Sequence, residues 1–176
     1  MKFIETPLYG AYIIEIEPVM DERGFFARSW CREEFEALSL NTSIAQCGIS
    51  YNLLKGTLRG LHYQESPFEE AKLVRCTRGA IYDVIADIRP SSPTYKKWSA
   101  FELTAQNHRT LYVPEGFAHG FQSLEDETEV FYQLSEFYHP EAARGIRWDD
   151  PLFNFDWPLE GRIISERDLR FPDFGG

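Results

Sequence analysis

One stretch decides how this sequence folds and where its chemistry lies: Leu58-Arg59-Gly60-Leu61-His62-Tyr63-Gln64. It predicts a β-strand with an internal glycine, which marks a bulge or a close approach of another backbone. Side chains alternate between the two faces of a strand, so Arg59 and His62 point to opposite sides of a regular one. They share a pocket only if the strand is bulged or bent at Gly60. A surface arginine with a satisfied core histidine is the alternative that this stretch leaves open.

Short β-rich segments with turn residues between them continue on both sides of this strand. The predicted strands span residues 12–17, 24–30, 42–49, 58–64, 72–77, 80–88, 99–104, 110–113, 118–124 and 129–136. Helical character is confined to residues 32–38 and to a short helix that begins at Ser165, where Ser165 and Asp168 have the spacing of a capping pattern. Because strands and helices do not alternate, we expect a mainly β single domain over residues 1–176, a sandwich, jelly roll or barrel. The tail from Pro151 is expected to wrap the β core.

The composition excludes several classes of function. Hydrophobic residues make up 43% of the 176 residues and aromatic residues 15%, which is enough for a real core. A formal net charge of −10 argues against nucleic-acid binding, which needs a basic excess. No apolar run is long enough to cross a membrane, and Glu5 falls where a signal peptide has its apolar stretch. The odd count of three cysteines, without a Cys-x-x-Cys pair, fits a reducing compartment, so we expect a cytoplasmic protein without membrane contact.

The next apolar strand begins with a lysine, Lys72. In Lys72-Leu73-Val74-Arg75-Cys76, the side chains of Lys72, Val74 and Cys76 share one face. A lysine beside valine and cysteine predicts an ammonium that points into the space enclosed by a barrel. The alternative is a lysine that protects the edge of a sheet.

A second histidine follows the turn at Pro114-Glu115-Gly116, which places His119 and Phe121 on one face of the strand after it. Together with His62, this pattern indicates two imidazoles inside one barrel and raises the question of a metal. Gln64 stands where metal-binding β-barrels carry a further histidine. Two histidines without a third strong ligand make a poor site, so we expect no metal and no other cofactor.

A carboxylate near the end of the chain, Asp168, offers a partner for an imidazole. An aspartate on one ring nitrogen fixes the tautomer and raises the basicity of the other nitrogen. A helix-capping role within a wrapping tail is the alternative. None of these signals is specific by itself.

Taken together and in order, the motifs resemble one family. They are Arg23-Gly24-Phe25-Phe26, Leu58 to Gln64, Lys72-Leu73-Val74-Arg75, Asp87-Ile88-Arg89, Ser92-Pro93-Thr94, Pro114 to Phe121, Trp148-Asp149-Asp150-Pro151, Trp157-Pro158 and Ser165-x-x-Asp168. Their order and spacing, over nearly the whole chain, are similar to those of the dTDP-4-dehydrorhamnose 3,5-epimerase family. The resemblance implies a cupin-like jelly-roll barrel, a homodimer, no metal and a nucleotide-linked 4-keto-6-deoxy sugar as substrate.

The catalytic roles that the resemblance implies agree with the chemistry of the side chains. His62 is the implied base, Asp168 its dyad partner, Tyr132 the acid and Lys72 the cation near the keto oxygen. A hydrogen next to a ketone is weakly acidic, so its removal needs a base that works near neutral pH, as imidazole does. A lysine can stabilise the charge of the resulting enolate, and inversion needs a proton donor on the opposite face, which a tyrosine can be.

The substrate-binding residues that the resemblance implies are Arg23, Phe26, Gln46, Arg59, His119 and Tyr138. Arginines meet a diphosphate with forked hydrogen bonds, so an acidic protein can still bind an anion locally. Two departures from the family pattern lie around the nucleotide base: Arg28 replaces a glutamate, and Cys47-Gly48 replace Asp-Asn. They leave CDP- or GDP-linked sugars as alternatives to dTDP-linked ones.

The sequence leaves further alternatives open. The enzyme inverts carbon 3, carbon 5 or both, or it moves the ketone between carbons 3 and 4 as a ketoisomerase. A metal-dependent cupin that uses His62 and His119, and a non-catalytic binder of nucleotide sugars, are alternatives from other classes. The alternating apolar residues of the segment 1–17 predict a strand that pairs with a second copy, in line with a homodimer.

Overall fold

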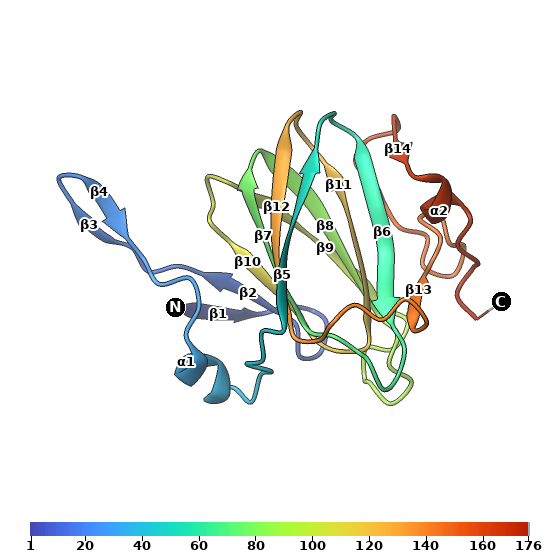
Figure 1. The fold of residues 1–176 in the computed structure, drawn as a ribbon, viewed down its shortest axis with the longest axis horizontal. Coiled ribbons are helices and arrows are strands. Elements are labelled where there is room, and N and C mark those ends of the chain that lie inside the picture. The colour runs from blue at the N-terminus through green and yellow to red at the C-terminus, as the bar shows by residue number, and fades with distance from the viewer. Residues whose placement is uncertain (176) are drawn as a thin grey trace.

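The computed structural model describes residues 1–175 and contains two β-sheets that face each other (Figure 1). The first sheet has the strand order β1 (Lys2–Glu5), β2 (Tyr12–Glu15), β10 (Thr110–Val113), β7 (Lys72–Arg78), β12 (Thr128–Leu134) and β5 (Gln46–Asn52). The second has the order β13 (Ala143–Gly145), β6 (Thr57–Gln64), β11 (Phe117–Ser123), β8 (Ala80–Asp87) and β9 (Trp98–Thr104). The short strand β14 (Ile163–Ile164) lies parallel to β6. This is the mainly β, jelly-roll architecture expected from the sequence, with two separate sheets instead of one closed barrel.

Two short helices complete the fold. They are α1 (Arg32–Glu36) and α2 (Glu166–Leu169), and both fall where the sequence predicts helical turns. Ser165 caps α2, because its hydroxyl accepts a hydrogen bond from the backbone N–H of Asp168. Neither helix is long or apolar enough to span a membrane.

One predicted strand is displaced along the chain. The sequence predicted residues 42–49, whereas β5 covers Gln46–Asn52. Its position follows from its antiparallel partner β12, whose ends Leu134 and Thr128 pair with Gln46 and Asn52. β5 is therefore an edge strand, and its free edge is not paired within residues 1–175.

A hairpin projects from the body of the molecule, at the left of Figure 1. It consists of β3 (Val19–Asp21) and β4 (Gly24–Phe26), where the sequence predicted one strand over residues 24–30. The chain reverses because Asp21 accepts a hydrogen bond from the backbone N–H of Arg23 at 2.8 Å, as an aspartate does in a turn. All six residues of the two strands are exposed.

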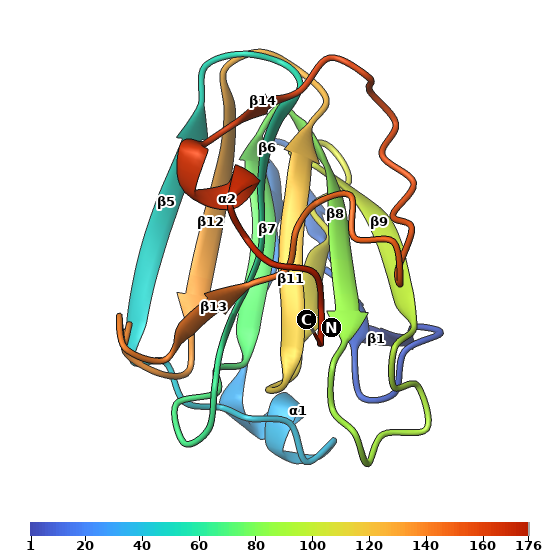
Figure 2. The same ribbon diagram turned by 90° about the vertical axis from the view of Figure 1, so that its right-hand side faces the viewer.

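Apolar side chains pack in three layers around the two sheets. The core between the sheets is formed by residues such as Val74, Ile85, Leu111 and Phe121. The outer face of the first sheet is covered by Phe35 of α1. The outer face of the second is covered by the tail, through Phe153, Phe155 and Trp157 (Figure 2). Full burial of a large apolar side chain contributes about 1.5–3 kcal/mol, so the tail is part of the fold, as predicted.

The motif Asp87-Ile88-Arg89 has a structural role. The guanidinium of Arg89 donates to both carboxylate oxygens of Asp87, at 2.8 and 2.7 Å, and Thr94 donates to the same carboxylate. Burial by itself raises the pKa of Asp87, but these hydrogen bonds outweigh it and lower the pKa. The network fixes the loop between β8 and β9.

Candidate active site

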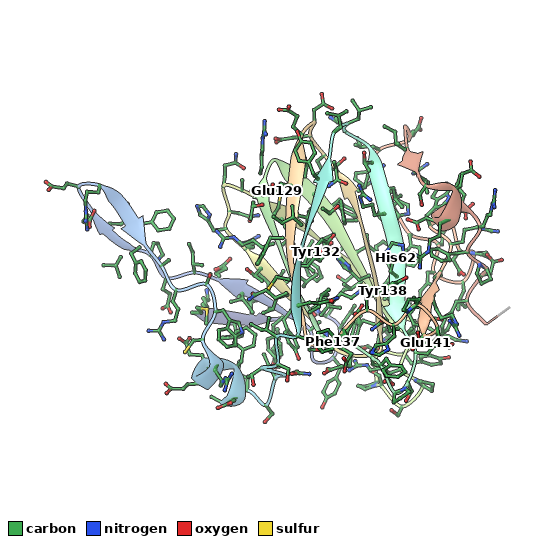
Figure 3. The ribbon with its side chains drawn as sticks, viewed as in Figure 1. His62, Glu129, Tyr132, Phe137, Tyr138 and Glu141 are labelled. Carbon is green, nitrogen blue, oxygen red and sulfur yellow. The ribbon has the colours of Figure 1, made fainter. Side chains whose placement is uncertain are left out.

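A cavity of about 330 Å³ lies between the two sheets. The predicted site residues that line it are Gln46, Arg59, His62, Lys72, His119, Tyr132 and Tyr138. The first sheet supplies Gln46, Lys72 and Tyr132, and the second supplies the arginine and both histidines. Figure 3 shows His62 and Tyr132 on strands of opposite sheets, so a molecule in the cavity is reached from both sides.

A bend at Gly60 brings Arg59 and His62 to the same cavity. The pairing of β6 with β11 shifts register between His119 and Phe121, opposite this glycine. Gly60 has φ +116°, and a Cβ there would lie 2.5 Å from the Cα of Gly120. Only glycine fits this backbone conformation and this close approach, so the bulge expected from the sequence is confirmed.

His62 and Asp168 form a hydrogen-bonded pair at the cavity. The Nε2 atom of His62 lies 2.9 Å from Oδ1 of Asp168, and the backbone N–H of Gly60 donates to Oδ2 at 3.0 Å. Burial by itself raises the pKa of Asp168, but the hydrogen bond and the charge of His62, with the N–H of Gly60, lower it overall. An ionised Asp168 keeps the proton of the imidazole on Nε2, which leaves Nδ1 as the basic nitrogen.

A second histidine–aspartate pair lies deeper between the sheets. Nε2 of His119 is 2.7 Å from Oδ1 of Asp83, and Oδ2 of Asp83 is buried without a hydrogen-bond partner among the described residues. The ring of Tyr132 meets that of His119 edge to face, with 6.1 Å between the ring centroids. Burial, and then the charge of Asp83, raise the pKa of Tyr132 well above its ordinary value, although Arg59 acts in the opposite sense. Tyr132 is therefore a neutral phenol that still carries its proton.

Lys72 and Arg59 bring positive charge to the cavity. The Lys72 ammonium lies 3.0 Å from Oε1 of Glu70 and donates to the carbonyl oxygen of His62 at 3.3 Å. Nε of Arg59 donates to Oδ1 of the buried Asn52 at 2.7 Å. Its Nη2 donates to the carbonyl oxygen of Tyr51 at 3.3 Å, so two contacts orient the guanidinium at the cavity wall, where its remaining donors can bind an anion.

Two predicted site residues are not brought to this cavity within one chain. Arg23 and Phe26 lie on the projecting hairpin, where Arg23 pairs with Asp21 and Phe26 is exposed. Figure 1 shows this hairpin on the far side of the first sheet from α2, which carries Asp168.

Sequence reasoning missed three side chains that support the site: Asn52, Glu70 and Asp83. Asp83 had a visible signal, because it is a charged residue inside the apolar run Ala80 to Ala86. A buried charge of this kind needs a partner, and here the partner is His119. Asn52 is a neutral residue beyond the end of a predicted β-rich segment and Glu70 follows a second glutamate, so neither carries such a signal.

Other places on the molecule fit this chemistry less well. A larger groove, of about 810 Å³, lies between the turn at residues 5–12 and the loop after α1, but histidine, lysine and arginine are absent from its lining. Within residues 1–175, no three His, Cys, Asp or Glu side chains come together in a way that would hold a metal ion.

A basic imidazole on one wall and a neutral phenol on the other are the arrangement of an acid–base enzyme, here built on a cupin-like jelly roll. The comparisons with known proteins identify the family. Residues 5–175 match the family model of dTDP-4-dehydrorhamnose 3,5-epimerase. A dTDP-4-dehydrorhamnose 3,5-epimerase of Methanothermobacter thermautotrophicus is 47% identical over 95% of this chain and 91% of its own length. The chain therefore belongs to the dTDP-4-dehydrorhamnose 3,5-epimerase family.

Solved structures agree with this assignment. The dTDP-4-dehydrorhamnose 3,5-epimerase of Elizabethkingia anophelis superposes with a TM-score of 0.96 and is 39% identical, over 99% of this chain and 96% of that one. A 3,5-epimerase of Legionella pneumophila in complex with dTDP-4-keto-L-rhamnose has a TM-score of 0.89 at 38% identity, over 97% and 90% of the two chains. A 3′-monoepimerase of Streptomyces bikiniensis in complex with dTDP-quinovose is similar at lower identity, 30%, with a TM-score of 0.87 over 96% and 85%.

Proposed function

We propose that this protein is an epimerase that inverts carbon 3, carbon 5 or both of a dTDP-linked 4-keto-6-deoxy sugar. The observation that carries the proposal is the placement of His62, with Asp168, on one sheet and the neutral Tyr132 on the facing sheet. A flat enolate between them can lose a proton to one side and gain one from the other, which is what inversion requires.

In the proposed reaction, Nδ1 of His62 takes the proton from the carbon next to the ketone. The electron pair of that C–H bond moves to the keto oxygen, where the Lys72 ammonium stabilises the negative charge. The phenol of Tyr132 then donates a proton to the opposite face of the carbon, and solvent restores both side chains to their starting state. The balance of protons and electrons is complete with these side chains and proton exchange with solvent.

The nucleotide part of the substrate is proposed to be dTDP. The relatives from L. pneumophila and S. bikiniensis are bound to dTDP sugars, and Arg59 offers oriented donors for a diphosphate. The departures at Arg28 and Cys47-Gly48 keep CDP and GDP as the alternatives to test. The guanidinium of Arg28 lies 3.0 Å from a carboxylate oxygen of Glu34. A Cβ atom at Gly48 would have no other atom within 4 Å, so there is free space beside this glycine.

We further propose that the protein acts as a homodimer. The hairpin exposes four apolar side chains: Val19, Met20, Phe25 and Phe26. Exposed apolar clusters of this kind mark interfaces, so the hairpin is the proposed contact with a second copy. In a dimer the hairpin reaches the second copy, which would bring Arg23 and Phe26 to the partner's cavity. A molecular mass of about 40 kDa by light scattering is expected from the 20.5 kDa chain, and about 20 kDa would contradict the dimer.

The cytoplasm is the proposed compartment. All three cysteines, Cys31, Cys47 and Cys76, are free thiols, as is usual in a reducing environment. Burial raises the pKa of the Cys76 thiol to about 11, so this residue is an inert part of the core.

Proton exchange in heavy water tests the proposed function. The protein is mixed with dTDP-4-keto-6-deoxyglucose, and NMR follows deuterium at carbons 3 and 5. Deuterium at both, with a rhamno-configured product, is expected of a 3,5-epimerase, whereas deuterium at one carbon indicates a monoepimerase. A ketone moved to carbon 3 would instead identify a ketoisomerase. If no exchange occurs with the dTDP-, CDP- or GDP-linked sugar, the proposal is wrong.

A further inference from the structure

A buried ion pair lies in the wall of the cavity. The side chains of Lys72 and Glu70 are only 7% and 11% exposed, and their charged atoms lie 3.0 Å apart. An ammonium out of water needs a close counter-charge to stay protonated. Of its three N–H donors, the described contacts use one on Glu70 and one on the carbonyl of His62. The third donor is left for the cavity that Lys72 lines.

Gln64 connects this carboxylate to a neighbouring loop. The two N–H donors of its Nε2 are shared among three acceptors: the carbonyl oxygens of Phe68 at 2.9 Å and Phe137 at 3.1 Å, and Oε2 of Glu70 at 3.2 Å. Its Oε1 accepts the backbone N–H of His139 at 2.6 Å. The contacts with Phe137 and His139 flank Tyr138, which lines the mouth of the cavity with its side chain half exposed. One buried amide therefore touches both the partner of Lys72 and the segment on either side of Tyr138.

We propose that Glu70 and Gln64 are positioning residues of the active site. Glu70 fixes the position of the Lys72 ammonium and directs it toward the keto oxygen, and Gln64 ties the Tyr138 segment to the same carboxylate. The inference rests on the proposed function. It extends that function, because it connects the Lys72 ammonium to the Tyr138 segment at the mouth of the cavity through a chain of hydrogen bonds. Glu70 acts through Lys72, and Gln64 acts through Glu70 and the loop.

A double-mutant cycle between Glu70 and Lys72 tests the first part. We expect E70Q to lower kcat roughly 10- to 100-fold with little change in KM, because the enolate charge is stabilised only in the transition state. In a K72M background, E70Q should cause no further loss, since its route to the substrate has already been removed. If the losses of E70Q and K72M multiply instead, Glu70 does not act through Lys72, and the inference is overturned.

The matched control is E69Q. Glu69 is the adjacent carboxylate, and no hydrogen bond or ion pair of it is present among the described residues, so its variant should keep the wild-type kcat. Thermal melting of each variant distinguishes lost positioning from lost folding. If E70Q does not fold, E70D and E70A are compared instead. We expect a smaller loss of kcat in E70D, because it keeps a carboxylate near Lys72.

Hydrogen exchange of the loop tests the second part. In Q64A the backbone amide of His139 loses its acceptor, so a peptide covering residues 135–142 should exchange faster than in the wild type. If Q64A does not fold, Q64M, which also removes the acceptor oxygen but keeps the length of the side chain, takes its place. Unchanged exchange would overturn the link to the loop. A wild-type protein that exchanges deuterium into no sugar would contradict the proposed function itself, whereas an active wild type with an active E70Q contradicts only the positioning role.

Discussion

The two histidine–aspartate pairs contain the same chemical groups in different surroundings. The His62 side chain is 41% exposed and its aspartate comes from the C-terminal helix α2. The His119 side chain is 5% exposed, and its aspartate comes from the neighbouring strand β8. Both histidines line the cavity, but the first pair is also open to solvent, whereas the second is almost fully buried.

The difference in exposure suits the two histidine–aspartate hydrogen bonds to different roles. A base must be reached by the substrate and must exchange its proton with water, so His62 is suited to turnover. A buried pair keeps a fixed charge close to its neighbours, and the charge of Asp83 contributes to the raised pKa of Tyr132. In the proposed mechanism, the open pair supplies the base, and the charge of the closed pair adds to burial in raising the pKa of the opposite acid, Tyr132.

Removal of each imidazole is the strongest test of this division. We expect H62A to lower the rate of deuterium exchange about 10³-fold, because general-base catalysis contributes roughly 10²–10⁴-fold. H119A should lower it less, by roughly tenfold, since His119 does not take the proton. Single-turnover NMR in heavy water measures both rates. Equal losses, or a greater loss for H119A, would show that the two roles are assigned the wrong way round.

The closed pair should also control the pH dependence of the rate. Tyr132 donates only when protonated, so the rate falls as the pH rises through its pKa. Because the charge of Asp83 helps to raise that pKa, D83N should move the alkaline fall of kcat to lower pH. The profile of kcat against pH checks this shift. Y132F is the matched variant, and its residual activity should lack the alkaline fall altogether.

The smallest effect expected is on stability in acid. The pKa of Asp168 is lower in the folded protein than in the unfolded chain, where it is about 3.9. Its contribution to stability is therefore present above that value and is lost as the pH falls through the folded pKa. D168N should be less stable than the wild type at pH 7, and the difference should shrink below about pH 4.

Urea unfolding between pH 3 and 7 measures this difference. Asp156 is an exposed residue of the same tail, and D156N serves as the control with an unchanged profile. A gap between D168N and the wild type that is constant with pH would mean that the carboxylate adds no pH-linked stability.

Much of the fold and part of the site could be predicted from the sequence. Most strands follow from alternation and turn residues, with β5 displaced and β3 missed, and Gly60 indicated the bulge that joins Arg59 to His62. The turn of the hairpin was missed, although its signal is local: Asp21 accepts from the N–H of Arg23, two residues further on, and Gly24 has a positive φ. That Arg23 and Phe26 lie outside the cavity of their own chain depends on how whole elements are arranged, which local patterns do not give.

The missed residues have a common physical cause. Asn52, Glu70 and Asp83 act through contacts with residues on other strands or loops, and such contacts depend on register. Asp83 stood out as a charge in an apolar strand, but its partner His119 is 36 residues away in sequence. Local patterns locate the side chains that need a partner more readily than they locate the partner.

The position of Asp168 in the sequence determines when the candidate site is complete during translation. A ribosome releases the chain from its N-terminus, so His62, Lys72, His119 and Tyr132 are all made before this carboxylate. By the end of β12 the nascent chain holds the imidazoles, the ammonium and the phenol, but nothing fixes the tautomer of His62. In the proposed mechanism, the site is therefore complete only after Asp168 has been synthesised and α2 packs against β6, where the aspartate bonds to His62.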